Sequence, residues 1–281
     1  MQLMNAGLPR QRGVTLVELM IGLLIGLIVL AVVGTVFINV IRGSNDTLSS
    51  IKLNQEVRGL MGFMTADIRR AGYWENAAIA STDPTIASDN PLSNRDAAGG
   101  PVTDIWIHDG GSCLMYSYDR DIDGDDGYVS DGDPAPLFGY RLDDNGRIQA
   151  TIPGELVEED GETNSCTPGS PPGANKNDAI DFEALTDERI VDITGLAFST
   201  EGSTCMNLTQ DVEWTLGSGA TMAACDDTAP GFTADDDDEL LEIRQIRITI
   251  TAEHRNDDSI KTTLSETVSV RNNRRLTYDA P

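Results

Sequence analysis

Basic residues are scarce in this chain of 281 residues, and histidine is almost absent. Lysine and arginine together number 20 against 46 aspartates and glutamates, which leaves a formal net charge of -26, and only two histidines occur. Binding to the phosphate backbone of nucleic acids requires a basic surface, so this balance excludes a nucleic-acid-binding function. An acidic chain instead favours solubility, divalent cations or basic partners.

The sequence also lacks the motifs of common enzymes. His108 and His254 lie far apart in sequence and form no H-E-x-x-H metal-binding pattern. No G-x-S-x-G nucleophile turn and no phosphate-binding glycine loop is present. These absences predict a protein that is not an enzyme.

Only four cysteines occur, and all lie downstream of the long apolar run near the N-terminus: Cys113, Cys166, Cys205 and Cys225. If this part of the chain is exported, the even count indicates two disulfides with three alternative pairings. We expect Cys205 to pair with Cys225, a bond that stabilises by ~3 kcal/mol in the chain-entropy model. Cys113 is then left to pair with Cys166.

Charge is nearly absent from residues 14–41, where Glu18 is the single ionisable residue. A run of this length exceeds the ~7–15 apolar residues of a cleavable signal peptide and suffices to span a bilayer, which takes ~20 residues. Arg10 and Arg12 precede the run, and residues 1–13 contain no acid. The positive-inside rule therefore keeps the first residues in the cytoplasm and predicts export of the bulk of the chain.

A carboxylate within a membrane helix costs at least ~2.5 kcal/mol, so Glu18 is expected to have a partner. No basic residue follows within the span before Arg42. If the peptide bond after Gly13 is cut, Val14 carries a new α-amino group that can pair with a glutamate on the same helix or a neighbouring one. The alternative is a plain membrane anchor that tolerates a glutamate near the interface.

The segment RGVTLVELM, residues 12–20, resembles the class III signal of type IV pilins and pseudopilins. This resemblance implies cleavage after Gly13 by a prepilin peptidase and methylation of the new N-terminus at Val14. It also implies that Glu18 meets the N-terminal amine of an adjacent subunit during assembly. Residues 1–13 are then the leader, and residues 14–41 are the half of a long helix that lies in the membrane or filament core.

Residues 42–74 are expected to form the amphipathic half of the same helix, ending at Gly72. Apolar residues recur there at helical spacing and predict a face packed on a globular head; they are Val57, Leu60, Met61, Met64 and Ile68. The segment TADIRRAGYW, residues 65–74, resembles the helix end of PilW-type minor pilins. Those relatives often continue with a small residue and a cysteine, whereas Glu75 and Asn76 follow here.

Residues 75–281 predict an exported, β-rich head. Two hairpins are expected, one formed by residues 102–108 and 113–118 and one by residues 137–142 and 147–152, which flank an Asp-Asp-Asn-Gly turn. Alternating apolar residues predict further strands over residues 189–199, 246–251 and 264–270. We therefore expect an α+β fold of the type IV pilin kind, with a long N-terminal α-helix and a C-terminal antiparallel β-sheet head.

Two acidic segments of the head have metal-binding or docking potential. Asp119, Asp121, Asp123 and Asp125 alternate with other residues before a glycine-containing turn, as in the first half of a calcium loop, so a Ca²⁺ site is one interpretation and a solvated loop the other. The run DDDDE at residues 235–239 is expected to be a solvated loop, with contact to a basic partner as the alternative.

The resemblance as a whole implies a PilW-like minor pilin. Such a protein is a single-pass prepilin of the inner membrane with a periplasmic head, and later a component of the extracellular pilus. Its expected partners are the prepilin peptidase, the major pilin, other minor pilins and a tip adhesin. Its expected role is priming or assembly near the pilus tip, in support of twitching motility or cell adhesion. The alternatives are a type II secretion pseudopilin and an uncleaved, membrane-anchored calcium-binding or adhesive module.

Overall fold

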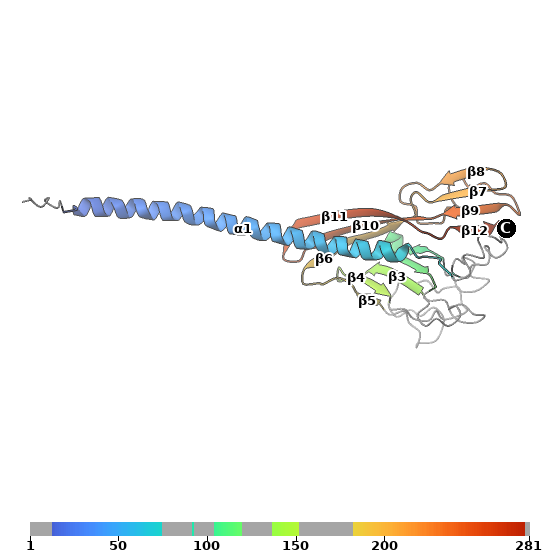
Figure 1. The fold of residues 1–281 in the computed structure, drawn as a ribbon, viewed down its shortest axis with the longest axis horizontal. Helices are drawn as coiled ribbons and strands as arrows, with labels where there is room; N and C mark the ends of the chain where they lie inside the picture. The colour runs from blue at the N-terminus through green and yellow to red at the C-terminus, as the bar shows by residue number, and fades with distance from the viewer. Residues whose placement is uncertain (1–12, 75–91, 93–103, 120–136, 152–181, 279–281) are drawn as a thin grey trace, which may run out of the picture. The chain divides into compact units, whose positions relative to one another are not determined.

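A computed structural model of the chain describes residues 13–74, 92, 104–119, 137–151 and 182–278 (Figure 1). The chain divides into two compact units, residues 1–49 and residues 50–281. The boundary falls within one helix, α1 (Leu16–Ile68). The expected leader, residues 1–13, lies outside the described residues except for Gly13.

The described part of the first unit consists of the N-terminal stretch of α1. Its residues 16–41 contain no proline and only one charge, so nothing interrupts the backbone hydrogen-bond ladder of the helix. Every residue from 16 to 48 is solvent-exposed in this chain except the half-buried Gly34. An 18-residue window of α1 reaches a mean hydropathy of 2.9 with none of it buried, so the helix is long and apolar enough to cross a membrane.

The second unit contains the C-terminal stretch of α1 and three antiparallel sheets. The first sheet has the order β1-β2-β3-β4-β5, the second β11-β10-β6 and the third β12-β9-β7-β8. The strands are β1 (Trp106–His108), β2 (Cys113–Ser117), β3 (Leu137–Leu142), β4 (Ile148–Thr151), β5 (Phe182–Ala184), β6 (Val191–Ser199), β7 (Thr204–Asn207), β8 (Val212–Thr215), β9 (Glu239–Ile243), β10 (Gln245–His254), β11 (Asp257–Ser269) and β12 (Arg274–Thr277). A long apolar helix followed by antiparallel sheets confirms the expected α+β class.

The two predicted hairpins and the later strands are confirmed within the described residues. β1 and β2 pair on either side of the short 3-10 helix η2 (Asp109–Gly111), and β3 pairs with β4. In the β3–β4 turn the amide of Gly146 donates to the carbonyl of Asp143, and Gly146 has a φ of 72°, a conformation that glycine adopts without strain. The strands predicted over 189–199, 246–251 and 264–270 correspond to β6, β10 and β11.

Three chain segments run through both the second and the third sheet, and β8 is added to the third sheet beside β7. β6 leads into β7, β9 into β10 and β11 into β12, and each sheet contains one strand from each segment. The break lies at Arg244, the single residue between β9 and β10. Its side chain is 4% exposed and forms a salt bridge with the buried Asp104, while its carbonyl accepts a hydrogen bond from the amide of Val270. A buried guanidinium paired in this way marks the point where one sheet ends and the next begins.

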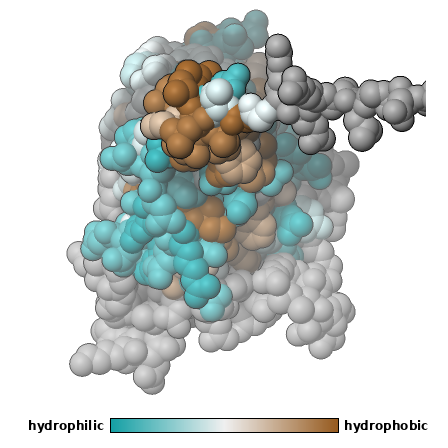
Figure 2. All heavy atoms as spheres, turned by 90° about the vertical axis from the view of Figure 1, so that its left-hand side faces the viewer, coloured by the Kyte–Doolittle hydropathy of each residue, from teal (hydrophilic) through white to brown (hydrophobic). Residues whose placement is uncertain are grey.

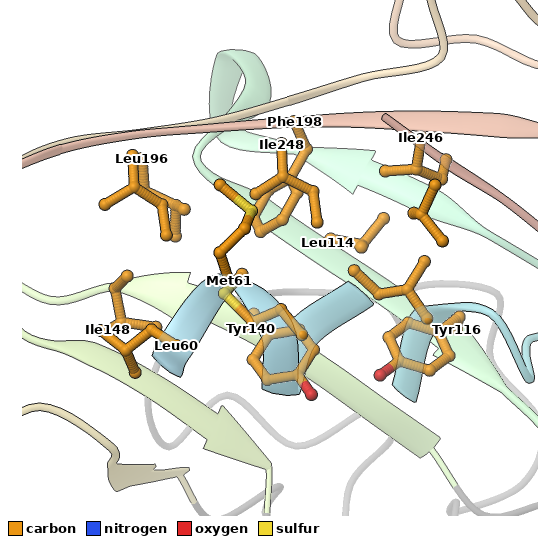
Figure 3. Packing of buried hydrophobic residues seen from close by; sticks show 14 of the residues in the cluster. Leu60, Met61, Leu114, Tyr116, Tyr140, Ile148, Leu196, Phe198, Ile246 and Ile248 are labelled. Carbon is orange, nitrogen blue, oxygen red and sulfur yellow. The ribbon is translucent and has the colours of Figure 1, made fainter. Parts of the chain in front are cut away.

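The main hydrophobic core of the second unit lies between α1 and the first two sheets. The helix residues Val57, Leu60, Met61, Met64 and Ile68 are all buried there together with Leu53, which confirms the predicted packing face. Figure 3 shows the side chain of Met61 between Tyr140 of β3 and Ile248 of β10. Full burial of one such side chain contributes ~1.5–3 kcal/mol. This face therefore holds the second half of α1 on the sheets.

Helix α1 ends at Ile68, four residues before the Gly72 expected from the sequence. The amides of Ala71 and Tyr73 donate to carbonyls three residues earlier, and the amide of Gly72 donates to the carbonyl of Ser117 in β2. Gly72 has a φ of 70°, and a Cβ placed there would lie 2.7 Å from a nitrogen of Arg244. The glycine thus permits the tight turn that follows the helix and is not the last helical residue.

Candidate functional site

The start of α1 is held by a reciprocal set of hydrogen bonds between Thr15 and Glu18. The amide of Thr15 donates to Oε2 of Glu18 at 3.0 Å, and its hydroxyl donates to the same oxygen at 2.9 Å. The amide of Glu18 in turn donates to the Thr15 hydroxyl oxygen at 3.3 Å. Thr15 immediately precedes the helix and Glu18 is its third residue, which is the arrangement of a capping box.

This capping box supplies a partner for Glu18 that the sequence reasoning above did not consider. The pattern Thr-x-x-Glu before an apolar run is itself a recognisable capping signal, so the sequence did contain it. Glu18 Oε2 accepts both bonds, and Oε1 accepts none from the described residues. The arrangement orients the carboxylate and leaves one of its oxygens available to a further donor.

Gly13 and Val14 lie directly before this cap and are exposed. The peptide bond between them is therefore not enclosed by other described residues. The amide of Thr15 belongs to the next peptide bond, so cutting after Gly13 leaves the capping box intact. Cleavage at this point adds a positive amine one residue before Thr15.

An apolar helix surface follows the cap. Leucine, isoleucine and valine side chains from Leu16 to Ile41 are between 44% and 73% exposed. Figure 2 looks along the helix from its N-terminal side, and its near end is coloured mostly brown for hydrophobic residues. Gly22 and Gly26 have nothing within 4 Å of an added Cβ, so both positions leave space for close approach of another helix. In water such a surface is unstable, and it requires a lipid or helical environment.

The other end of α1 is anchored by Asp67, which accepts hydrogen bonds from three tyrosine hydroxyls. The distances are 2.6 Å from Tyr116, 2.8 Å from Tyr118 and 3.1 Å from Tyr140. Burial, together with the hydrogen bond to the Asp67 carboxylate, raises the pKa of Tyr118 to about 12. Burial also raises the pKa of Tyr116 and Tyr140. The cluster joins the helix to β2 and β3 through one carboxylate.

Three of the four predicted calcium-binding residues lie outside the described residues. Asp121, Asp123 and Asp125 lie outside the described residues, and Asp119 is buried just after β2 with its amide donating to the carbonyl of Tyr73. Within the described ranges no group of three or more metal-binding side chains is found. The calcium interpretation stays a prediction.

The second acidic segment differs from the solvated loop expected for it. Asp235, Asp236 and Asp237 are exposed, but Asp238 is 4% exposed and Glu239 begins β9. The Asp238 carboxylate accepts a hydrogen bond from the amide of Asp235 and another from the side chain of Asn207, and these bonds lower its pKa. The expectation was wrong for Asp238, because its carboxylate accepts hydrogen bonds from its own turn and from Asn207 of β7 and is therefore buried.

The described cysteines of the second unit are disulfide-bonded. Cys205 of β7 and Cys225 are joined by a disulfide with a Cα–Cα distance of 5.1 Å. Cys113 is also disulfide-bonded, and Cys166 lies outside the described residues. The Cys205–Cys225 bond lies in a separate hydrophobic cluster with Trp214 and Leu240, so it stabilises the third sheet.

Each of the two histidines makes a local contact within the second unit. His108 stacks on Trp106 with 5.5 Å between ring centroids, and Nδ1 of His254 accepts a hydrogen bond from the amide of Asn256. They lie on different sheets, in β1 and β10. Neither arrangement is that of a catalytic pair.

Two protein-family models match the chain, one over most of its length and one at its N-terminus. A family model described as prepilin peptidase-dependent protein B matches residues 46–270. The model of the prokaryotic N-terminal methylation motif matches residues 8–34, which include the capping box and the start of the apolar helix. No curated protein and no solved structure matches the chain significantly.

Proposed function

The chain belongs to the family of prepilin peptidase-dependent protein B, and from this membership we propose that it is a minor pilin of a type IV pilus. It carries a prepilin-type signal and is pilin-like in fold. The finer steps form the proposal: assembly or priming of the filament, a place at or near its tip, and support of motility or adhesion. The likeness of residues 65–74 to PilW-type minor pilins favours this assignment over a secretion pseudopilin.

The proposed sequence of events begins in the inner membrane, with the head in the periplasm. The prepilin peptidase removes residues 1–13, and the new α-amine of Val14 is methylated. The mature chain then joins the filament through the apolar half of α1, and other pilins contact its head. The work of the protein is interaction rather than catalysis.

The observation that carries this proposal is the preformed geometry around Glu18. The carboxylate is held by Thr15 through Oε2, which leaves Oε1 for the α-amine of an adjacent subunit. In an apolar filament core, an ammonium–carboxylate pair is favourable only when both charges are matched. Each subunit entering the filament offers one such amine, so pairing of the two charges favours correct register.

The primary experiment is to shear filaments from cells and identify the N-terminal peptide of this chain by mass spectrometry in the sheared and membrane fractions. A peptide that begins at methylated Val14 in the sheared fraction supports a pilus subunit. The same peptide confined to membranes indicates a pseudopilin or an assembly primer. An intact leader in both fractions contradicts the proposal and leaves an uncleaved anchored binding module.

Variants at the cap separate the charge of Glu18 from its capping role. Glu18→Ala and Glu18→Gln should both be cleaved normally, yet be recovered in filaments at least about tenfold less, because losing one partner of a desolvated pair costs ~2–5 kcal/mol. Thr15→Ala is the matched control, because it removes the hydroxyl of the capping box but keeps the carboxylate. Loss of the capping hydroxyl costs ~1 kcal/mol of helix stability. Normal recovery of Glu18→Gln would show that the charge is not needed.

A further inference from the structure

Three exposed arginines gather where α1 ends. Arg69 and Arg70 directly follow the last helical residue, and both are exposed. The exposed Arg271 lies about 200 positions further along, but its amide donates to the carbonyl of Arg69 at 3.2 Å. The fold therefore brings two distant segments together and forms an arginine cluster, defined as Arg69, Arg70 and Arg271.

The carbonyl groups at the end of the helix do not require these guanidinium groups as caps. The carbonyl of Arg69 accepts from the Arg271 amide, and that of Arg70 accepts from the Tyr73 amide. The side-chain amide of Asn272 lies 3.4 Å from the Arg70 carbonyl and 3.2 Å from the Ala71 carbonyl. Capping is accomplished by amides, so the side chains of Arg69 and Arg271 remain available, whereas that of Arg70 interacts with Tyr118.

The cluster also has no acidic partner in the part of the chain that the structure describes. Other arginines of the second unit form ion pairs there, such as Arg147 with Asp143 and Arg255 with Asp192. None of the three cluster arginines forms a salt bridge with a described carboxylate, although the Arg70 guanidinium lies 5.9 Å from the ring centroid of Tyr118. Arg58 and Arg189 also form no salt bridge with a described carboxylate, so what distinguishes the cluster is that the fold places Arg271 beside Arg69.

The backbone beneath the cluster is held in position from inside the second unit. Arg244, paired with the buried Asp104, donates to the carbonyl of Asn272. Its side chain also lies against Gly72, where a Cβ would come within 2.7 Å of it. The two segments are thus fixed before any partner arrives, and a preorganised charged surface loses less entropy on binding.

The charge of the whole molecule indicates what the cluster binds. All but two of the 46 acidic residues and all but three of the 20 basic residues lie after residue 49, so the second unit is strongly acidic. Subunits of such charge repel one another, and a specific contact between them requires a local patch of the opposite sign. Guanidinium groups match carboxylates through paired N–H donors.

We propose that the arginine cluster is a docking surface for a carboxylate-rich segment of a neighbouring protein subunit in the filament. This rests on the proposed function, because it requires a filament or its assembly complex to supply the neighbour. The contact operates through the head and is separate from the Glu18 pairing in the helix. It sets which neighbour sits beside the end of α1.

The test reverses two charges of the cluster in the full-length chain and measures its recovery in sheared filaments relative to membranes. The double variant Arg69→Glu/Arg271→Glu should be cleaved normally but recovered at least about tenfold less, because like charges then face each other across the contact. Arg189→Glu is the matched control, since Arg189 is exposed on the turn before β6 and forms no salt bridge with a described carboxylate. Arg69→Lys/Arg271→Lys keeps the charge and should retain most of the recovery. An unchanged urea midpoint for the reversed variant verifies that the head still folds.

A photo-cross-linking residue at position 271 then identifies the neighbour. Support requires that the cross-link reaches an acidic segment of another subunit, and that changing those acids to lysine restores recovery of the reversed variant. Normal recovery of the reversed variant overturns the proposal. A loss of recovery that no acid-to-lysine change in the neighbour restores also overturns it, as do cross-links to phospholipid alone. A wild-type chain that keeps its leader in both fractions instead defeats the proposed function, so the two failures can be told apart.

Discussion

The Asp67 cluster offers the sharpest test of how α1 is fastened to the head. Replacing Asp67 with alanine removes the acceptor of three hydrogen bonds from tyrosines that are almost completely buried. Hydrogen bonds to a charged group contribute ~1.5–3 kcal/mol each, but the values are not additive. Because the hydroxyls of Tyr116 and Tyr140 lie close enough to interact with each other, we expect a loss of about 3–5 kcal/mol rather than the full sum.

The assay is urea unfolding of the full-length chain in non-ionic detergent, followed by near-ultraviolet circular dichroism of the aromatic residues. Asp258→Ala is the matched control, since Asp258 is an exposed acid of β11, and it should change stability by less than about 0.5 kcal/mol. A double-mutant cycle with Tyr118→Phe measures the coupling directly. The reasoning is refuted if Asp67→Ala costs less than about 1 kcal/mol, or if Tyr118→Phe costs the same with and without Asp67.

Two further predictions concern the same head. Replacing both Cys205 and Cys225 with alanine should lower the free energy of unfolding by about 3 kcal/mol, because the bond closes a sequence separation of 20 residues; an unchanged urea midpoint would contradict this. Alkaline pH should destabilise the head from about pH 10 upward, because the pKa of Tyr118 is about 12 when folded and near 10 when unfolded, so the unfolded chain loses its proton first. The stability that Tyr118 contributes is then fully present below pH 10 and is lost as pH rises through 12. When urea midpoints are measured at increasing pH, Tyr118→Phe should flatten this decline.

Local patterns determined the parts of the fold that depend on neighbouring residues in the sequence. The uninterrupted apolar run predicts α1, and alternating residues with an Asp-Asp-Asn-Gly turn predict the β3–β4 hairpin. The apolar spacing of residues 57–68 predicts the buried helix face, because helical periodicity places those side chains on one side. The capping box was equally readable, since Thr15 and Glu18 are three residues apart.

The exact end of α1 was not determined in this way. Glycine at position 72 is a common stop signal, but the amide of Gly72 pairs with Ser117 of β2 instead of with the helix. The third sheet likewise follows from pairing between segments far apart, such as β7 with β9. Register between distant strands depends on tertiary packing, which local propensity does not contain.

The methylation motif could be identified from the sequence alone, whereas the arginine cluster could be identified only from the tertiary structure. By itself the sequence determined that a prepilin-type methylation motif precedes and opens an apolar helix, because all of the motif lies within one short segment, residues 8–34. Only the tertiary structure decided that Asp238 is buried, that Asp67 binds three tyrosines and that Arg271 lies beside Arg69. Each of these contacts joins a polar or backbone group to partners that the chain brings near only when distant strands pair or the sheets pack on the helix, so charge and polarity in the sequence alone do not reveal them.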